Sequence, residues 1–365
     1  MLRQLCLHVT NRCNFNCSYC FVPKTREDMP LRVAYQAIRF MREQYKGDDI
    51  VLSFFGGEPL LAYESIKKIT SYARERGIKY FLLVTNGLLL DKEKLSFLTR
   101  NKVDLAISSD GVPRAHDLTR RLKGNKTSWG KVDKKLDFLN SNYRAVLGRT
   151  TFNPSCIGLT FTPQTVNSLS ASARYLVDKF KGHKIYLSLV PAMPLAKEWK
   201  AVIKGGGLES ILRKEMRGIA DLFIGRLIKK SPFNFTVNFC FLIDRWSDPL
   251  RSKIMEEVPF CCAGTKKLFV STDGGIFPCY MPASLPRKSR RFLAGDVYAG
   301  ITDPKALLSF SSFKNKAFSC LYWNYKVNQN AGKPAEVYSI LYKSWVEAVR
   351  YIRDQVRIRG YPVEH

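Results

Sequence analysis

The sequence predicts an α/β fold in which parallel strands form an open, partial barrel. Segments with a strand pattern alternate with helical segments about six times before residue 195, and such alternation implies right-handed βαβ units with parallel strands. Six strands are too few for a closed eight-stranded barrel. The most distinctive cysteine, glycine and polar residues follow these strands directly, at the edge where sheets of this kind hold their sites.

The expected strands combine period-two alternation, as at Leu5, Leu7 and Val9, with short apolar runs. They lie at 2–10, 49–55, 79–85, 103–109, 157–162 and 184–190. The expected helices lie at 30–44, 61–77, 91–101, 129–141, 164–180 and 208–230. Pro30 favours the beginning of the first helix, and Gly77 the end of the second.

The alternation stops after about residue 232. The elements expected beyond it are a hairpin over 267–280 and helices near 303–316 and 335–356. The hairpin turns at 273–275, where Asp and Gly are typical turn residues. We place a linker within 231–260, and we predict a partial (β/α)6 barrel over 1–231 and a smaller C-terminal domain over 232–365.

Composition narrows the class of protein. With 365 residues, of which 45% are hydrophobic, the chain can bury a large core. No apolar run has the length of a transmembrane helix, and the first residues lack the pattern of a signal peptide. The ten cysteines are clustered, which speaks against a disulfide scaffold. We therefore expect a cytoplasmic protein with reduced thiols and no membrane partner.

The charge is strongly positive, with 59 Lys and Arg against 31 Asp and Glu, a net charge of +28. Such a field attracts polyanions, so nucleic acid, an acidic peptide or an acidic carrier protein all fit. A solvated surface adapted to the conditions of the host explains the charge as well. Charge therefore widens the choice of partner and does not decide it.

Cys13, Cys17 and Cys20 follow the first expected strand within eight residues. A structural zinc site closes its tetrahedron with four ligands, and a [4Fe–4S] cubane takes four thiolates. Three thiols therefore leave one iron of a cubane open to a substrate or cofactor. The spacing favours a cluster over zinc and leaves both open, since Cys6 and His8 lie on the strand, away from its periodic face.

The spacing Cys13-x3-Cys17-x2-Cys20, with Tyr19 before the third cysteine, resembles the radical S-adenosylmethionine (SAM) superfamily. So does the segment Gly56-Gly57-Glu58-Pro59, which ends the second strand. The resemblance covers about 1–195. It implies that the three cysteines hold a [4Fe–4S] cluster whose open iron binds SAM, and that reductive cleavage of SAM yields a 5′-deoxyadenosyl radical. It also implies that the Gly-Gly-Glu-Pro segment hydrogen-bonds the amino group of SAM, although two glycines and a proline also suit a plain tight turn.

Polar residues end the next two strands. Asn86 follows the third strand, and Ser108 and Asp110 end the fourth, with His116 and Arg120 shortly after. This stretch is similar to the SAM-contacting segment of the peptide- and protein-modifying branch of the superfamily. The similarity implies that Ser108 binds the ribose or carboxylate of SAM and that Arg120 clamps the carboxylate. Taken singly, these residues also suit solvated loops, and His116 suits a loop-ordering role.

Cys262, Cys279 and Cys320 resemble the auxiliary-cluster domain of the SPASM and twitch type. The resemblance implies at most one auxiliary iron–sulfur cluster, because the dense cysteine run of a full SPASM domain is missing. A fourth ligand would be Cys261, Cys240, a substrate thiolate or none. Otherwise these cysteines are small buried hydrophobes.

Two features bear on the substrate. Sulfatase maturases commonly carry an Asp after the cysteine that matches Cys279, and this chain carries Tyr280, which speaks against sulfatase maturation. Tyr280 suits hydrogen-atom donation or plain packing. The basic stretch 286–291 suits an acidic leader peptide as well as a solvated loop. No leader-binding domain precedes Cys13, so we expect leader recognition by this surface or by a separate protein.

Four functions remain, and all but the last are enzymatic. The first is a radical SAM enzyme that modifies a peptide or protein side chain, by oxidation, crosslinking or epimerisation, as in the maturation of ribosomally made peptides. The others are a radical SAM dehydrogenase of a small molecule, a nucleic-acid-modifying enzyme, for which no RNA-binding motif is evident, and a non-catalytic iron–sulfur protein. The enzymes need a reductant such as flavodoxin or ferredoxin. An acidic peptide encoded beside the gene would favour the first.

Overall fold

A computed structural model describes nine stretches of the chain, namely 3–142, 156–180, 185–192, 196–228, 235–239, 264, 267–280, 292–308 and 335–358. Within them, one continuous sheet runs in the order β11-β10-β9-β8-β1-β2-β3-β4-β5-β6-β7. The strands are β1 Gln4–Thr10, β2 Val51–Gly56, β3 Tyr80–Thr85, β4 Val103–Ser108, β5 Cys156–Phe161, β6 Ile185–Pro191, β7 Phe235–Phe239, β8 Lys267–Val270, β9 Gly275–Phe277, β10 Gly295–Asp296 and β11 Gly300–Ile301.

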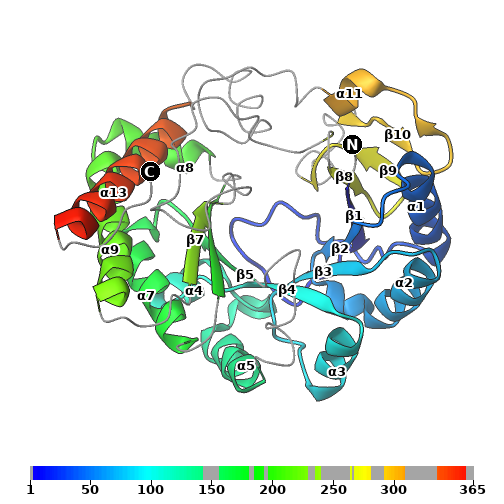
Figure 1. Ribbon diagram of the computed structural model, residues 1–365, viewed down its shortest axis with the longest axis horizontal. Helices are drawn as coiled ribbons and strands as arrows, with labels where there is room; N and C mark the ends of the chain where they lie inside the picture. Colours follow the sequence, from blue (N-terminus) through cyan, green and yellow to red (C-terminus); the bar gives the residue numbers. More distant parts are fainter. Residues whose placement is uncertain are drawn as a thin grey trace.

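Helices line the outside of this curved sheet, as Figure 1 shows. They are α1 Leu31–Gln44, α2 Tyr63–Glu75, α3 Lys92–Arg100, α4 Pro113–Thr119, α5 Trp129–Ser141, α7 Leu169–Lys179, α8 Ala196–Lys204, α9 Leu208–Ile228, α11 Pro304–Leu308 and α13 Ala335–Ile358, with short 3-10 turns between some of them. The strands from β1 to β7 pair in parallel, and β8 pairs in parallel with the other edge of β1. The two ends of the strand order, β7 and β11, do not pair with each other, so the barrel stays open.

The core lies between the sheet and the helices. Leu5, Leu7 and Val9 of β1 are at most 1% exposed and belong to the cluster that includes the buried faces of α1 and α2. Burying each such side chain contributes about 1.5–3 kcal/mol. The alternate positions of β1, among them Cys6 and His8, project from the opposite side of the sheet into the barrel interior. The sequence of β1 thus builds the core with one face and the site with the other.

The predicted fold class is confirmed, and the six predicted strands before residue 195 all form. The hairpin also forms, with β8 and β9 antiparallel. Phe235–Phe239 pair with β6 as strand β7, so this part of the range 231–260 belongs to the sheet, and a linker in the rest of that range stays a prediction. The hairpin does not stand apart from the barrel sheet, since Leu268 pairs with Leu5 of β1. The sheet therefore crosses the boundary proposed at residue 231, which itself stays a prediction.

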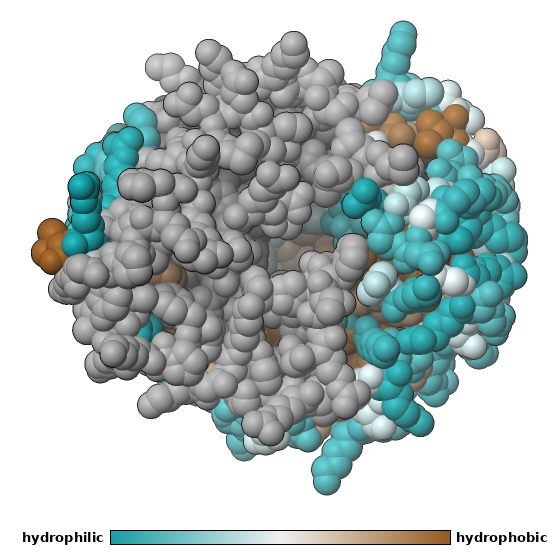
Figure 2. Space-filling model, in the orientation of Figure 1, coloured by the Kyte–Doolittle hydropathy of each residue, from teal (hydrophilic) through white to brown (hydrophobic). Residues whose placement is uncertain are grey.

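In Figure 2 the surface over α1 and α2 is predominantly hydrophilic. Among the described helices, none combines the length and the apolar character that crossing a bilayer would require.

Candidate active site at the carboxyl ends of the strands

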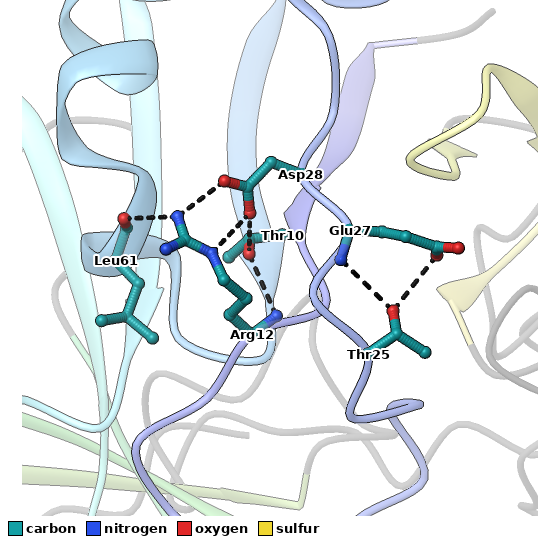
Figure 3. A network of polar contacts seen from close by, with 6 residues as sticks. All are labelled: Thr10, Arg12, Thr25, Glu27, Asp28 and Leu61. Carbon is teal, nitrogen blue, oxygen red and sulfur yellow. Dashed lines mark hydrogen bonds and ion pairs between the residues drawn. The ribbon is translucent and has the colours of Figure 1, made fainter.

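The loop that carries the three cysteines is clamped at its base. Arg12 donates two parallel hydrogen bonds to Asp28, Nε to Oδ1 at 2.8 Å and Nη2 to Oδ2 at 2.6 Å, and a third to the Leu61 carbonyl at 2.8 Å (Figure 3). The Asn11 amide donates to the Glu27 carbonyl at 2.8 Å. A bidentate, charge-assisted pair fixes geometry as well as adding strength. The clamp therefore holds residues 11–28 as one closed loop beside the Gly-Gly-Glu-Pro turn.

The two glycines of that turn lie directly against the backbone of the cysteine loop. The Gly57 amide donates to the Thr10 carbonyl, and the Glu58 amide to the Arg12 carbonyl, both at 2.8 Å. A Cβ at Gly56 would lie 2.3 Å from the Thr10 carbonyl oxygen, and one at Gly57 would lie 2.3 Å from that of Arg12. No side chain fits at either distance, so glycine is required here by contact between two backbones.

The Glu58 side chain reaches the end of β3. It is fully buried and accepts hydrogen bonds from the Thr85 hydroxyl at 2.7 Å, the Asn86 amide at 2.8 Å and the Leu60 amide at 3.0 Å. Burial raises the pKa of Glu58, and these hydrogen bonds oppose the rise. Asn86 in turn donates to the Asn14 side chain at 2.7 Å. Glu58 and Asn86, both predicted as cofactor-binding residues, thus tie the ends of β2 and β3 to the cysteine loop.

Tyr19, Asp110 and Arg120 form one buried polar cluster, which joins the cysteine loop to the end of β4. The Tyr19 hydroxyl donates to Asp110 Oδ2 at 3.0 Å and accepts from Arg120 Nη1 at 2.6 Å. Burial raises the pKa of Asp110 to about 6, while Arg120 acts to lower it. Arg120 is 6% exposed, and its Nε has no hydrogen-bond partner in the described structure. A buried donor without a partner is costly unless a ligand meets it, so Arg120 fits the predicted binding of an anionic group.

His116 orders this segment from behind. It is buried, its Nδ1 accepts from the Asp110 amide at 3.4 Å, and its Nε2 lies 3.0 Å from the Ser128 hydroxyl. The Ser128 hydroxyl also donates to the Arg120 carbonyl. Burial lowers the pKa of His116 to about 3, which keeps the ring neutral. Ser108, at the end of β4, is half-buried beside this cluster.

The three cysteines lie in the loop that these contacts hold in place. Cys13 is buried, Cys17 and Cys20 are half-buried, and the Phe15 amide lies 3.4 Å from the Cys13 sulfur as a donor. Burial raises the pKa of Cys13 to about 11 and raises that of Cys17, while the positive charges of Arg120 and Lys24 act to lower the latter. Amide donors and nearby cations are the surroundings that stabilise thiolate ligands.

Within the described ranges, no three His, Cys, Asp or Glu side chains converge as a single metal ion requires.

Tyr280, which follows the hairpin of β8 and β9, reaches the same place. Tyr280 stacks on Phe55 of β2 with ring centroids 5.0 Å apart, and on Phe21, the residue after Cys20, at 5.2 Å. His8 meets Phe55 and Phe269 of β8 edge-on at 6.1 and 5.6 Å. These stacked rings bring Cys279, which precedes Tyr280, toward the cysteine loop. The parallel pairing of β8 with β1 is the cause, because it puts both carboxyl ends at one edge of the sheet.

Most predicted site residues can be placed, and some cannot. The structure brings Tyr19, Asp110 and Arg120 together and packs Gly56 and Gly57 against the cysteine loop, and Pro59 begins a short buried 3-10 turn after Glu58. The remaining predicted cluster cysteines lie outside the described residues; they are Cys240, Cys261, Cys262 and Cys320.

The clamp of Arg12 and Asp28 was not predicted, nor was the ring nitrogen of buried His8, which has no hydrogen-bond partner among the described residues. In the sequence, Arg12 beside Cys13 was the available signal for the clamp.

Comparison with known proteins gives three findings. Residues 7–154 match the radical SAM superfamily. The chain is 33% identical over 155 residues to the uncharacterized protein MJ0907 of Methanocaldococcus jannaschii, covering 41% of this chain and 52% of that protein. It is 23% identical over 285 residues to the cysteine-type anaerobic sulfatase-maturating enzyme of Clostridium perfringens (strain 13 / Type A), covering 73% of this chain and 71% of the enzyme. The chain thus spans only about half of the first of these relatives.

The fold has solved counterparts. The structure described as native anSMEcpe with bound AdoMet and Cp18Cys peptide superposes with a TM-score of 0.69 at 19% identity. The superposition covers 98% of this chain and 100% of that one. At this identity the likeness concerns the fold, which is a partial barrel with an additional C-terminal region.

Proposed function

Residues 7–154 of this chain match the radical SAM superfamily, and from this match we propose that the protein is a radical SAM enzyme that modifies a side chain of a peptide or protein. The single observation that carries the proposal is the contact between the three-cysteine loop and the Gly56–Gly57 backbone. Two amide–carbonyl hydrogen bonds of 2.8 Å lock these segments together at the carboxyl edge of the parallel sheet. A plain strand-to-helix turn has no need of such a contact.

In this proposal Cys13, Cys17 and Cys20 hold a [4Fe–4S] cluster, and the segment from Gly56 to Pro59 binds SAM beside it. The cluster, once reduced by one electron, would supply the chemistry that cleaves the C5′–S bond of SAM to methionine and a 5′-deoxyadenosyl radical able to take a hydrogen atom from the substrate. The protein's own residues set the geometry. The pair of Arg12 and Asp28 keeps the loop closed, and Glu58 holds the ends of β2 and β3 together.

Arg120 binds the carboxylate of SAM through its unpartnered Nε. Tyr19 and Asp110 hold the guanidinium in place from the other side. His116, which is neutral, positions Asp110 and Ser128 and moves no proton. Ser108, at the end of β4, contacts the ribose or carboxylate of SAM in this arrangement.

A peptide or protein substrate is favoured by two observations. The Clostridium perfringens relative is a sulfatase-maturating enzyme, and the superposed structure contains a bound peptide. The net charge of +28 favours an acidic substrate. Tyr280 follows Cys279 where sulfatase maturases commonly carry Asp, so we propose a reaction other than sulfatase maturation. One auxiliary iron–sulfur cluster, held by Cys262, Cys279 and Cys320, is part of this proposal.

Mass spectrometry of a candidate peptide tests the function. The anaerobically reconstituted protein is mixed with SAM, dithionite and an acidic peptide encoded beside its gene. A mass change in the peptide that appears with 5′-deoxyadenosine, and only in the presence of SAM, supports the proposal. Formation of 5′-deoxyadenosine with no change in any such peptide would remove the substrate class and leave the radical chemistry standing.

A further inference from the structure

A short segment of the chain lies along the outer side of the cysteine loop. The Asn16 amide donates to the Arg121 carbonyl at 2.6 Å, the Ser18 amide to the Thr119 carbonyl at 2.8 Å, and Phe15 and Leu122 form a β-bridge. Segment 119–126 is therefore fixed beside Cys17. Cys17 is half-buried, and its two neighbours in the chain, Asn16 and Ser18, are both exposed.

The loop and the segments after β4 carry five exposed cations, which are Lys24, Arg26, Arg114, Lys123 and Lys126. The Lys123 amide donates to the Asn14 carbonyl at 3.3 Å, and the Lys126 carbonyl accepts from the Leu122 amide at 2.9 Å, so both lysines lie in the segment beside the loop. In the part of the chain that the structure describes, none of them forms an ion pair.

The acidic residues of the loop offset this charge only in part. Asp28 is paired with Arg12, and Glu27, which accepts from the neutral Asn11 side chain at 2.8 Å, keeps its single negative charge. We call the surface formed by these five cations and Leu118 the loop-side patch.

Leu118 gives the patch an apolar centre. It lies in α4, four residues after Arg114 and three before Arg121, and it is 49% exposed. An exposed leucine alone means little. An apolar anchor surrounded by charged residues, however, is the usual anatomy of a transient protein interface. Segment 113–119 forms a helix here because its inner residues, Ala115, His116 and Thr119, are buried against the site.

We propose that the loop-side patch docks an acidic one-electron donor protein. This inference rests on the proposed function, because only a cluster at Cys13, Cys17 and Cys20 needs such a donor. In the transfer, the reduced donor loses one electron and the cluster gains it, and no proton or group moves. The positive charge of the patch steers the acidic donor toward the protein. Leu118 then anchors the donor beside Cys17, whose two neighbours in the chain are exposed.

The position of the patch, more than the total charge, carries the argument. Lys24 hydrogen-bonds the side chain of Asn16, the residue before Cys17, so the charge of the patch begins beside the cluster loop. A donor held here would not cover the inward-facing positions of the strands, where the substrate is expected. Reduction and substrate binding would therefore use different sides of the loop.

The test compares two charge-reversal variants that each change the net charge by four. The patch variant is Lys123→Glu/Lys126→Glu. The control is Lys46→Glu/Lys68→Glu, whose lysines are also exposed, after α1 and on α2. The probe is an acidic plant-type ferredoxin, with a potential of about −400 mV. Formation of 5′-deoxyadenosine from SAM is measured at low salt with reduced ferredoxin and, in parallel, with dithionite, which needs no docking. Affinity for oxidised ferredoxin is measured by calorimetry on the reconstituted protein without SAM.

We expect the patch variant to lose about tenfold in the ferredoxin-driven rate and in affinity for ferredoxin, with an unchanged dithionite-driven rate. The control variant keeps the wild-type ferredoxin-driven rate and the wild-type affinity for ferredoxin. Added salt weakens the affinity of the wild type for ferredoxin. Equal losses in both variants would show a response to net charge alone and overturn the proposal, as would no loss in either. If the patch variant lost affinity for single-stranded RNA but kept its affinity for ferredoxin, the patch would be a nucleic-acid-binding surface and the proposal would be overturned. If dithionite yields no 5′-deoxyadenosine even with the wild type, the proposed function fails first.

Discussion

Glu58, Asp104 and Asp110 are buried carboxylic acids that differ in the hydrogen bonds they accept. Glu58 accepts three hydrogen bonds from the protein, and Asp110 is held by Tyr19, by Thr119 and by the Thr160 amide. Asp104, on β4, has a carboxylate oxygen with no hydrogen-bond partner among the described residues. The first two acids build the site. The third costs stability when it is ionised.

Replacing Glu58 with glutamine should loosen the site. Both oxygens of the carboxylate accept hydrogen bonds, whereas glutamine offers one acceptor and turns its NH₂ group toward a donor. We expect a loss of about 1–3 kcal/mol in the free energy of unfolding and a lower iron content after reconstitution. Denaturant unfolding and iron analysis measure both. Glu64→Gln, at an exposed position on α2, is the matched control, and equal behaviour of the two variants would contradict the role of Glu58.

Asp104 should make stability depend on pH. Burial raises its pKa to about 7, from 3.8. The folded state therefore holds a proton that the unfolded state loses near pH 4, so stability falls as the pH rises from about 4 to 7. We expect Asp104→Asn to raise the free energy of unfolding at pH 8 by on the order of 2 kcal/mol relative to its effect at pH 5. Unfolding at the two pH values decides this, with exposed Asp354→Asn as the control. A variant whose effect is the same at both pH values would refute the assignment.

The contact between the cysteine loop and the Gly-Gly-Glu-Pro turn is the element-scale feature on which the site depends. A Cβ on Gly57 would lie 2.3 Å from the Arg12 carbonyl oxygen, and backbone cannot give way as a flexible side chain can. We expect Gly57→Ala to displace the loop, to lower stability by about 2 kcal/mol or more, and to reduce the iron bound per chain.

Gly130→Ala is the matched control for Gly57→Ala. A Cβ at Gly130 meets nothing within 4 Å, and the residue lies in α5. We expect this variant to be unchanged or slightly more stable, because alanine favours a helix over glycine. Thermal unfolding and iron analysis compare the pair. Full iron content in Gly57→Ala would mean that the close packing of the two segments does not hold the cluster loop.

The sequence was sufficient for those elements that carry a local pattern. The strands from β1 to β6 and the long helices have clear periodicity, and the hairpin of β8 and β9 has its turn residues. Helix α4 was missed because it is short and its buried residues include the polar His116 and Thr119, which serve the site. The parallel pairing of β8 with β1 was missed because it joins residues more than 260 positions apart, and no local pattern encodes such a contact.

The candidate site divides in the same manner. The cysteines and the glycine turn were identifiable from spacing and resemblance. The clamp of Arg12 and Asp28 was not, since an ion pair between two loop residues leaves no periodic trace. Arg120 was expected to bind SAM directly, but its contact with Tyr19 and Asp110 emerged only from the fold.

At the scale of the whole molecule, one sheet contains strands from both the predicted barrel and the predicted C-terminal domain. The strands β8 and β9 come from the part assigned to a second domain, yet they extend the barrel sheet beside β1. The aromatic stack of Phe21, Phe55 and Tyr280 places the segment of Cys279 next to the cysteine loop. The net charge of +28 is consistent with one acidic partner at the loop-side patch and an acidic substrate.

The cleavage of SAM by the reconstituted, dithionite-reduced protein tests the central claim most directly. The wild type is compared with Cys17→Ala and with Cys6→Ala, which removes a buried thiol of β1 outside the cluster loop. The account predicts 5′-deoxyadenosine from the wild type and from Cys6→Ala, and none above background from Cys17→Ala. Formation of 5′-deoxyadenosine by Cys17→Ala as fast as by the wild type would contradict it.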